Sequence, residues 1–60
     1  MKIIRLKEVI LLTGLARSTV YKFIKAQGFP KQVSLGGRSV GWIESEIEAW
    51  IVEKIEARDK

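Results

Sequence analysis

Residues near the start of the chain follow the period of a helix. Leu6, Val9, Ile10 and Thr13 fall at helical spacing, and the charged side chains between them face outward. A helix is therefore predicted from Leu6 or Lys7 to about Leu12. Gly14 is expected to end this helix, because glycine adopts the left-handed conformation without a Cβ penalty.

A second helix is predicted to start close to Ala16–Ser18 and to end before Gly28. Its buried stripe is expected to consist of Val20, Phe23 and Ile24. Gly28 is expected to end the helix, and Pro30 prevents its resumption because proline cannot donate a helical hydrogen bond.

The period then changes from that of a helix to that of a strand. Polar and apolar residues alternate over 32–35, Gly36 and Gly37 favour a tight turn, and 39–42 is typical of a returning strand. A third helix is predicted from Glu44 or Ser45 to Ala57. Its apolar face is expected to consist of Ile47, Trp50, Ile51 and Ile55. The predicted order is helix, helix, hairpin, helix within a single domain over residues 1–60.

Residues 8–25 have the pattern of a helix-turn-helix, in which two short helices flank a turn that contains glycine. This arrangement projects the outer face of the second helix towards a DNA major groove. The residues of that face are predicted to bind DNA: Arg17, Ser18, Thr19, Tyr21, Lys22 and Lys25. The face contains no acidic residue. A pair of helices with a purely structural role would have no reason to exclude carboxylates from this face.

Charge supports the same interpretation. The chain has 11 Lys and Arg against 7 Asp and Glu, a net charge of +4, and basic domains are common among nucleic-acid binders. Eight bases and one acid lie in residues 1–43, whereas 44–60 hold six acids and three bases. We also predict that Lys31 contacts phosphate and that Arg38, beside the hairpin turn, reaches phosphate or the minor groove.

Each candidate residue also has a structural interpretation. Tyr21 would then be a half-buried aromatic, and the cations would be solvated surface charges. Trp42 and Trp50 would stack on bases in a single-strand binder, but their spacing favours burial in the core. Leu11 and Leu12 either belong to the core or mark a surface for a partner.

Composition excludes several other functions. The chain has no Cys and no His, which excludes zinc fingers and nucleophile systems that use Cys or His. The carboxylates are spread along the third helix without a nucleophile beside them, so no enzyme activity, metal or cofactor is expected. The longest apolar run is Val9–Leu12, which is too short to span a membrane, and a signal peptide is not apparent. A cytoplasmic, nucleoid-associated protein without membrane contact is predicted.

The sequence also resembles the AlpA-type prophage regulators of bacteria, which overlap with phage excisionases and more distantly with MerR-type DNA-binding domains. The segments that carry the resemblance are 4–9, Thr13–Lys22, Gly28–Lys31 and Val40–Ile47 with Trp50. The resemblance implies a winged helix-turn-helix that binds double-stranded DNA and regulates an integrase-type gene or acts as an excisionase, with integrase or RNA polymerase as partner. Ala16 stands where many relatives have Ser, so a capping hydroxyl is missing there unless Ser18 partly replaces it.

Two alternative functions are those of a protein–protein adaptor and of an RNA-binding protein. A small protein–protein adaptor would bind a basic partner through the acidic third helix. RNA binding is disfavoured because the aromatic residues are committed to the core. For DNA, the small size of the chain favours a monomer that binds neighbouring sites cooperatively and bends the DNA between them.

Overall fold

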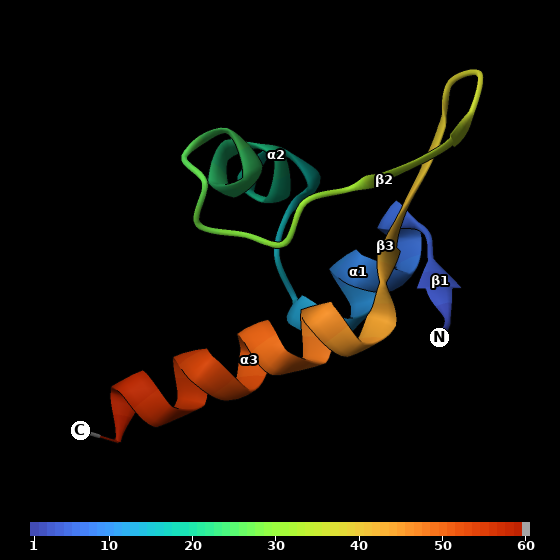
Figure 1. The fold of residues 1–60 in the computed structure, drawn as a ribbon. Helices are drawn as coiled ribbons and strands as arrows, with labels where there is room; N and C mark the ends of the chain where they lie inside the picture. The colour runs from blue at the N-terminus through green and yellow to red at the C-terminus, as the bar shows by residue number, and fades with distance from the viewer. Residues whose placement is uncertain (60) are drawn as a thin grey trace.

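Three helices and three short strands make up the computed structural model, which describes residues 1–59 (Figure 1). Along the chain they are β1 (Ile3–Ile4), α1 (Leu6–Thr13), α2 (Arg17–Lys25), β2 (Val33–Gly36), β3 (Ser39–Ile43) and α3 (Glu44–Arg58). The predicted fold class is confirmed: the protein is mainly helical with a small antiparallel hairpin, consistent with a winged helix-turn-helix. Lys60, the last residue of the predicted domain, lies outside the described residues.

The strand β1 was not predicted, and it makes the sheet three-stranded. The strands lie in the order β1-β3-β2, and both pairings are antiparallel. Ile4 of β1 is opposite Trp42, and just beyond it the N–H of Glu44 donates to the carbonyl of Lys2 at 2.9 Å. The Nζ of Lys2 also lies 3.8 Å from Oε2 of Glu44. A two-residue strand is too short to show alternation, which is why the sequence pattern does not reveal it.

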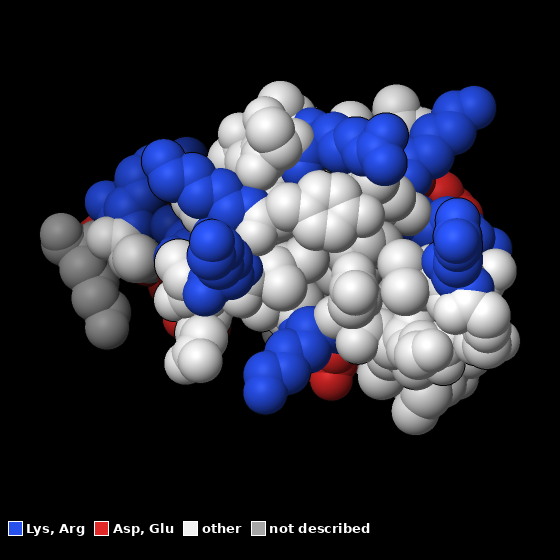
Figure 2. All heavy atoms as spheres, turned by 90° about the horizontal axis from the view of Figure 1, so that it is seen from above, with Lys and Arg blue, Asp and Glu red and all other residues white. Residues whose placement is uncertain are grey.

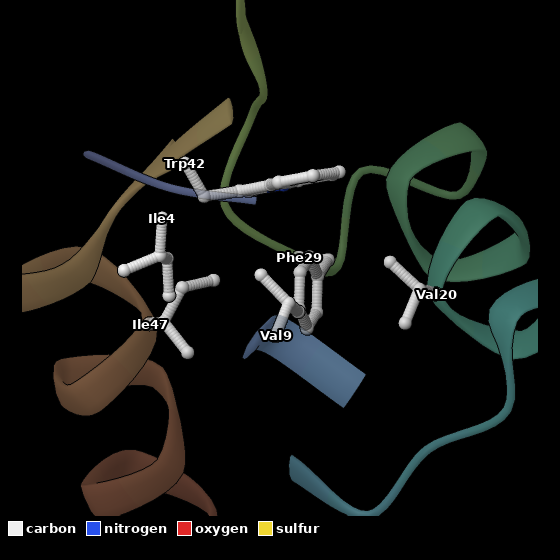
Figure 3. Close-up of a cluster of buried hydrophobic side chains, with 6 residues drawn as sticks. All are labelled: Ile4, Val9, Val20, Phe29, Trp42 and Ile47. Atoms are coloured by element: carbon white, nitrogen blue, oxygen red, sulfur yellow. The ribbon is translucent and has the colours of Figure 1, made fainter. Parts of the chain in front are cut away.

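The core draws one side chain from nearly every element (Figure 3). Its buried members are Ile4, Val9, Val20, Phe29, Trp42 and Ile47. Burial of each such side chain contributes about 1.5–3 kcal/mol, which matters in a domain of this size. The predicted burial of Trp42 is confirmed, whereas Phe29 joins the core from a loop that has no periodic pattern.

The expected apolar face of α3 is only partly buried. Ile47 is fully buried and Trp50 is half-buried, but Ile55 is 44% exposed, so the expected apolar face is covered less completely towards the end of the helix. Fifteen helical residues extend for about 22 Å, and the C-terminal end of α3 projects past the other elements (Figure 1). The sequence period marks a helix face, but it does not show where the covering elements stop.

Gly41 allows the three strands to approach one another at the centre of the sheet. A Cβ at this position would lie 2.5 Å from Cγ2 of Ile3 and 3.0 Å from the carbonyl oxygen of Ile4. Ile3 is β-branched and stiff at its first side-chain torsion, so it cannot easily move aside. Glycine is therefore required where β1 crosses close to β3.

Candidate nucleic-acid interface

The turn between α1 and α2 is held by local hydrogen bonds. Gly14 has φ 72°, in the left-handed region, and its N–H donates to the carbonyl of Ile10 at 2.8 Å. The hydroxyl of Thr13 donates to the carbonyl of Val9 at 2.7 Å and accepts the N–H of Leu15 at 3.3 Å. Leu15 packs half-buried against the core. The predicted role of Gly14 in ending the first helix is confirmed, and the turn fixes the direction in which α2 leaves α1.

Burial divides α2 into two faces. Val20 is buried, and Phe23 and Ile24 pack half-buried against the core, as predicted. The exposed residues are Arg17, Ser18, Tyr21, Lys22 and Lys25. Thr19 is half-buried at the edge between the faces, so it is the least accessible of the six candidates on this helix. Three cations and no carboxylate therefore lie on the open face.

No side chain caps the N-terminus of α2. The N-cap residue is Ala16, and it makes no side-chain capping hydrogen bond, so the hydroxyl that many relatives have at this position is missing. Ser18 is the second helical residue, where its hydroxyl lies past the capping position. The first N–H groups of a helix lack helical partners, and the helix dipole makes this end attractive to an anion such as phosphate.

The C-terminus of α2 is fixed differently from the prediction, which assigned the helix stop to Gly28. The helix ends at Lys25, and it is Gln27 that has the left-handed conformation, with φ 62°. The N–H of Gln27 donates to Ile24 at 3.0 Å and the N–H of Gly28 donates to Phe23 at 2.9 Å, which is the Schellman pattern. A helix stop at a non-glycine residue has no clear sequence signal.

A contact with α3 anchors the same end of α2. The indole N–H of Trp50 donates to the carbonyl of Gly28 at 2.7 Å. The ring of Trp50 packs edge-on against Phe29, with centroids 4.8 Å apart, and lies 6.2 Å from Phe23. Sequence periodicity predicted burial of Trp50, but it did not reveal that this residue positions α2. Lys31 follows the anchored segment and is exposed.

The hairpin β2–β3, called the wing below, extends from the same side of the molecule as α2 (Figure 1). Gly36 and Gly37 have φ 104° and 56°, so the predicted glycine turn is confirmed. Arg38 is exposed in the turn. Ser39, also exposed at the start of β3, adds a hydroxyl beside Arg38 that the sequence reasoning did not single out.

Figure 2 views the molecule from the side of α2 and the wing tip. Lys and Arg side chains lie along this face from one end to the other, and only small areas of Asp and Glu are visible. Within residues 1–59 the ion pairs are Lys2–Glu44 and Arg58–Asp59, and neither involves a candidate DNA contact. The cations of α2, Lys31 and Arg38 are thus open to an external polyanion.

Residues 1–59 contain no cluster of three or more His, Cys, Asp or Glu side chains that would suit a metal ion. Within the same residues, none of the helices combines the length and apolar character that a bilayer crossing requires.

The amino-acid sequence of this chain is similar to those of known proteins. The family model described as Prophage CP4-57 regulatory protein (AlpA) matches residues 2–55, from the N-terminal segment to near the end of α3. The chain is 46% identical over 59 residues to the uncharacterized protein ORF88 of Enterobacteria phage P4, with 98% of this chain and 67% of that protein covered. It is 42% identical over 59 residues to the DNA-binding transcriptional activator AlpA of Escherichia coli (strain K12), with 88% and 84% covered.

Proposed function

The chain belongs to the AlpA family of prophage regulatory proteins, and we propose that it regulates transcription by binding specific sites in double-stranded DNA through α2 and the wing. The observation that carries the proposal is the open face of α2, where Arg17, Lys22 and Lys25 are exposed without a carboxylate among them. A helix held by its buried side presents such a face to the major groove.

The position of each residue suggests its role. Arg17 and Lys22 lie towards the start and middle of the open face, where they would reach base edges, and Tyr21 lies between them. Ser18 and Thr19 are in the first turn, whose N–H groups favour phosphate.

Three further cations would hold the duplex in place. Lys25 and Lys31 follow the direction of α2 and would contact phosphates without reading sequence. Arg38 at the wing tip would reach the backbone or the minor groove beside the helix.

The regulated gene is proposed to encode an integrase. The relative named as a DNA-binding transcriptional activator supports a role in transcription. RNA polymerase is proposed as the second partner. An excisionase role would instead require binding at attachment-site DNA together with integrase. The two roles differ in where the protein binds and in whether transcription changes.

Footprinting with the purified chain tests the proposal. Fragments carrying the integrase-gene promoter region, the prophage attachment region and a scrambled sequence are compared, with a promoter reporter measured alongside. We expect protection upstream of the promoter and a change in reporter output. Protection confined to the attachment region with unchanged output would replace the transcriptional role by excision. Equal affinity for all three fragments would contradict sequence-specific binding altogether.

Salt dependence provides a second test of the same interface. If α2, the wing and neighbouring cations neutralise about four to six phosphates, log K should fall with log salt at a slope of about −4 to −5. Titrations at several salt concentrations measure this slope directly. An affinity for duplex DNA that does not change with salt would contradict the electrostatic interface.

A further inference from the structure

Exposed apolar side chains gather where the ends of α1 and α3 meet. Leu12 and Ile55 are 48% and 44% exposed, and the neighbouring Leu11 and Val52 are 75% and 50% exposed. Between the two helices runs an open groove of about 250 Å³, called the α1–α3 groove below. Leu12, Ile51 and Ile55 line this groove together with Trp50, Lys54 and Arg58. The proposed DNA contacts do not line this groove.

Residues 48–58 of α3 carry a pattern that is complementary to itself. Glu48, Ile51, Ile55 and Arg58 are spaced by three, four and three residues, which places them in one stripe of the helix. Read in the opposite direction, the stripe runs Arg, Ile, Ile, Glu. An antiparallel copy therefore aligns isoleucine with isoleucine and carboxylate with guanidinium. A parallel copy would place like charges together at both ends.

We propose that the α1–α3 groove is covered by a second copy of this chain, with the two α3 helices antiparallel about a two-fold axis near residue 53. Ile51 of each copy then lies opposite Ile55 of the other, and Ile55 enters the neighbour's groove beside Leu12. Glu48 pairs with the neighbour's Arg58, and the two-fold symmetry makes this pair twice. The contact answers the question that the sequence left open for Leu12: it belongs to a partner surface.

Arg58 is available for this pairing. Its Nε lies 3.0 Å from Asp59 Oδ1, but its side chain is 74% exposed. A guanidinium has five N–H donors, so a contact through Nε leaves others for a second carboxylate. Glu48 is exposed on the same helix.

The size of the patch sets the strength of the pair. A few apolar side chains per copy bury less area than a permanent dimer requires, so the association is weak in free solution. Two copies bound at neighbouring DNA sites are held at a high effective concentration, where a weak contact suffices. Figure 1 shows α3 on the side of the molecule away from the wing tip, so pairing through α3 leaves the tip uncovered. The contact thus supplies a physical basis for cooperative binding.

Sedimentation equilibrium without DNA tests the pair independently of DNA binding. We expect a monomer–dimer equilibrium with a dissociation constant of about 10 µM to 1 mM. Ile55→Glu should raise this constant at least about tenfold, because it brings a carboxylate into the apolar groove. Leu35→Glu is the matched control, since Leu35 is 45% exposed on the wing and should leave the constant unchanged. Circular dichroism confirms that both variants are folded.

Reversing the charges of Glu48 and Arg58 tests whether the two α3 helices pair antiparallel, and it leaves the apolar residues of the contact unchanged. Glu48→Arg alone and Arg58→Glu alone should each raise the dissociation constant several-fold, because each creates two like-charge contacts per dimer. The double variant should return to within about twofold of the original constant. A chain that stays monomeric up to about 1 mM, or that forms larger assemblies, would overturn the proposal. A double variant that is no better than the single ones would overturn it equally.

Discussion

The helices α2 and α3 pack on the same core but expose opposite chemistry. α2 has nine residues and shows an open face with three cations and no carboxylate. α3 has fifteen residues and carries five glutamates, with Ile47 buried near its start and Ile55 44% exposed near its end. The short helix α2 is held in place by contacts with neighbouring elements, and α3 supplies some of these contacts through Trp50.

Their contact explains how the two roles are linked. Trp50 of α3 reaches the carbonyl of Gly28, just past the end of α2, and its ring packs against Phe29. Only small areas of Asp and Glu are visible on the face that holds α2 and the wing tip (Figure 2), and more carboxylates there would oppose the binding of a polyanion. Substitutions of the side chains through which α3 packs on the core, such as Trp50, should therefore act on folding, and substitutions on the open face of α2 should act on binding.

The largest effect is expected from Trp50→Ala. This change removes the ring contacts with Phe29 and leaves the Gly28 carbonyl without its donor, which should cost about 3 kcal/mol of unfolding free energy. A domain of sixty residues has only about 3–9 kcal/mol in total, so much of the protein should unfold. Urea denaturation followed by circular dichroism measures the loss.

Trp50→Phe is the control for this variant. It keeps an aromatic ring against Phe29 but removes the indole N–H, so the unfolding free energy should fall by less than in Trp50→Ala. The lost hydrogen bond should account for about 1 kcal/mol of this decrease, in addition to the effect of the smaller ring. A Trp50→Ala protein that remains fully stable but no longer binds DNA would break the comparison, because it would place α3 in the DNA interface.

Arg17→Ala and Lys22→Ala should show the opposite behaviour. Each is expected to cost about 1–3 kcal/mol of binding free energy on the specific site and to relax the base preference there. The unfolding free energy of each variant should stay within about 0.5 kcal/mol of that of the unsubstituted protein, because both side chains are exposed. Gel-shift titrations on specific and scrambled duplexes, with urea denaturation alongside, measure both quantities.

Two kinds of control sharpen this test. Lys25→Ala and Lys31→Ala should weaken specific and scrambled duplexes about equally, since phosphate contacts carry no sequence information. Glu53→Ala on α3 should leave binding unchanged or slightly tighter, because it removes a negative charge from the protein. Equal losses on both duplexes for Arg17 and Lys22 variants would mean that the open face of α2 does not read bases.

Local rules predicted the parts of the fold that depend on local conformation. Gly14 and the pair Gly36 and Gly37 all adopt positive φ, and the two faces of α2 follow from the period of Val20, Phe23 and Ile24. The open face of α2 was therefore predictable, because it consists of the residues on the side of the helix opposite the buried stripe.

The missed features depend on contacts between distant segments. β1 exists only because Ile4 pairs with Trp42, and Phe29 is buried because Trp50 of α3 packs on it. Neither contact leaves a period in the sequence. Ile55 has the spacing of a core residue, but it is 44% exposed at the edge of a groove that it lines with Leu12 of α1. How far the wing extends beside α2 likewise depends on the whole packed domain.

The smallest effect expected here is a gain of stability at the end of α2. Gln27 has φ 62°, which brings its Cβ close to the backbone, whereas glycine has no Cβ and adopts this conformation freely. Glycine also loses more chain entropy on folding, so the net gain from Gln27→Gly should be about 0.5–1 kcal/mol. The midpoint of urea unfolding should rise accordingly.

Gly14→Ala is the matched control for Gln27→Gly, because it places a Cβ at φ 72° with nothing within 4 Å to clash. It isolates the backbone strain and should lower stability by about 1 kcal/mol. DNA affinity of Gln27→Gly should not change, since Gln27 lies past the end of α2 and outside its open face. An unfolding midpoint that falls would mean that the Gln27 side chain itself stabilises the join between α2 and α3. A changed DNA affinity would mean that the end of α2 takes part in the interface, and the separation between the binding helix and the supporting helix would then be less complete.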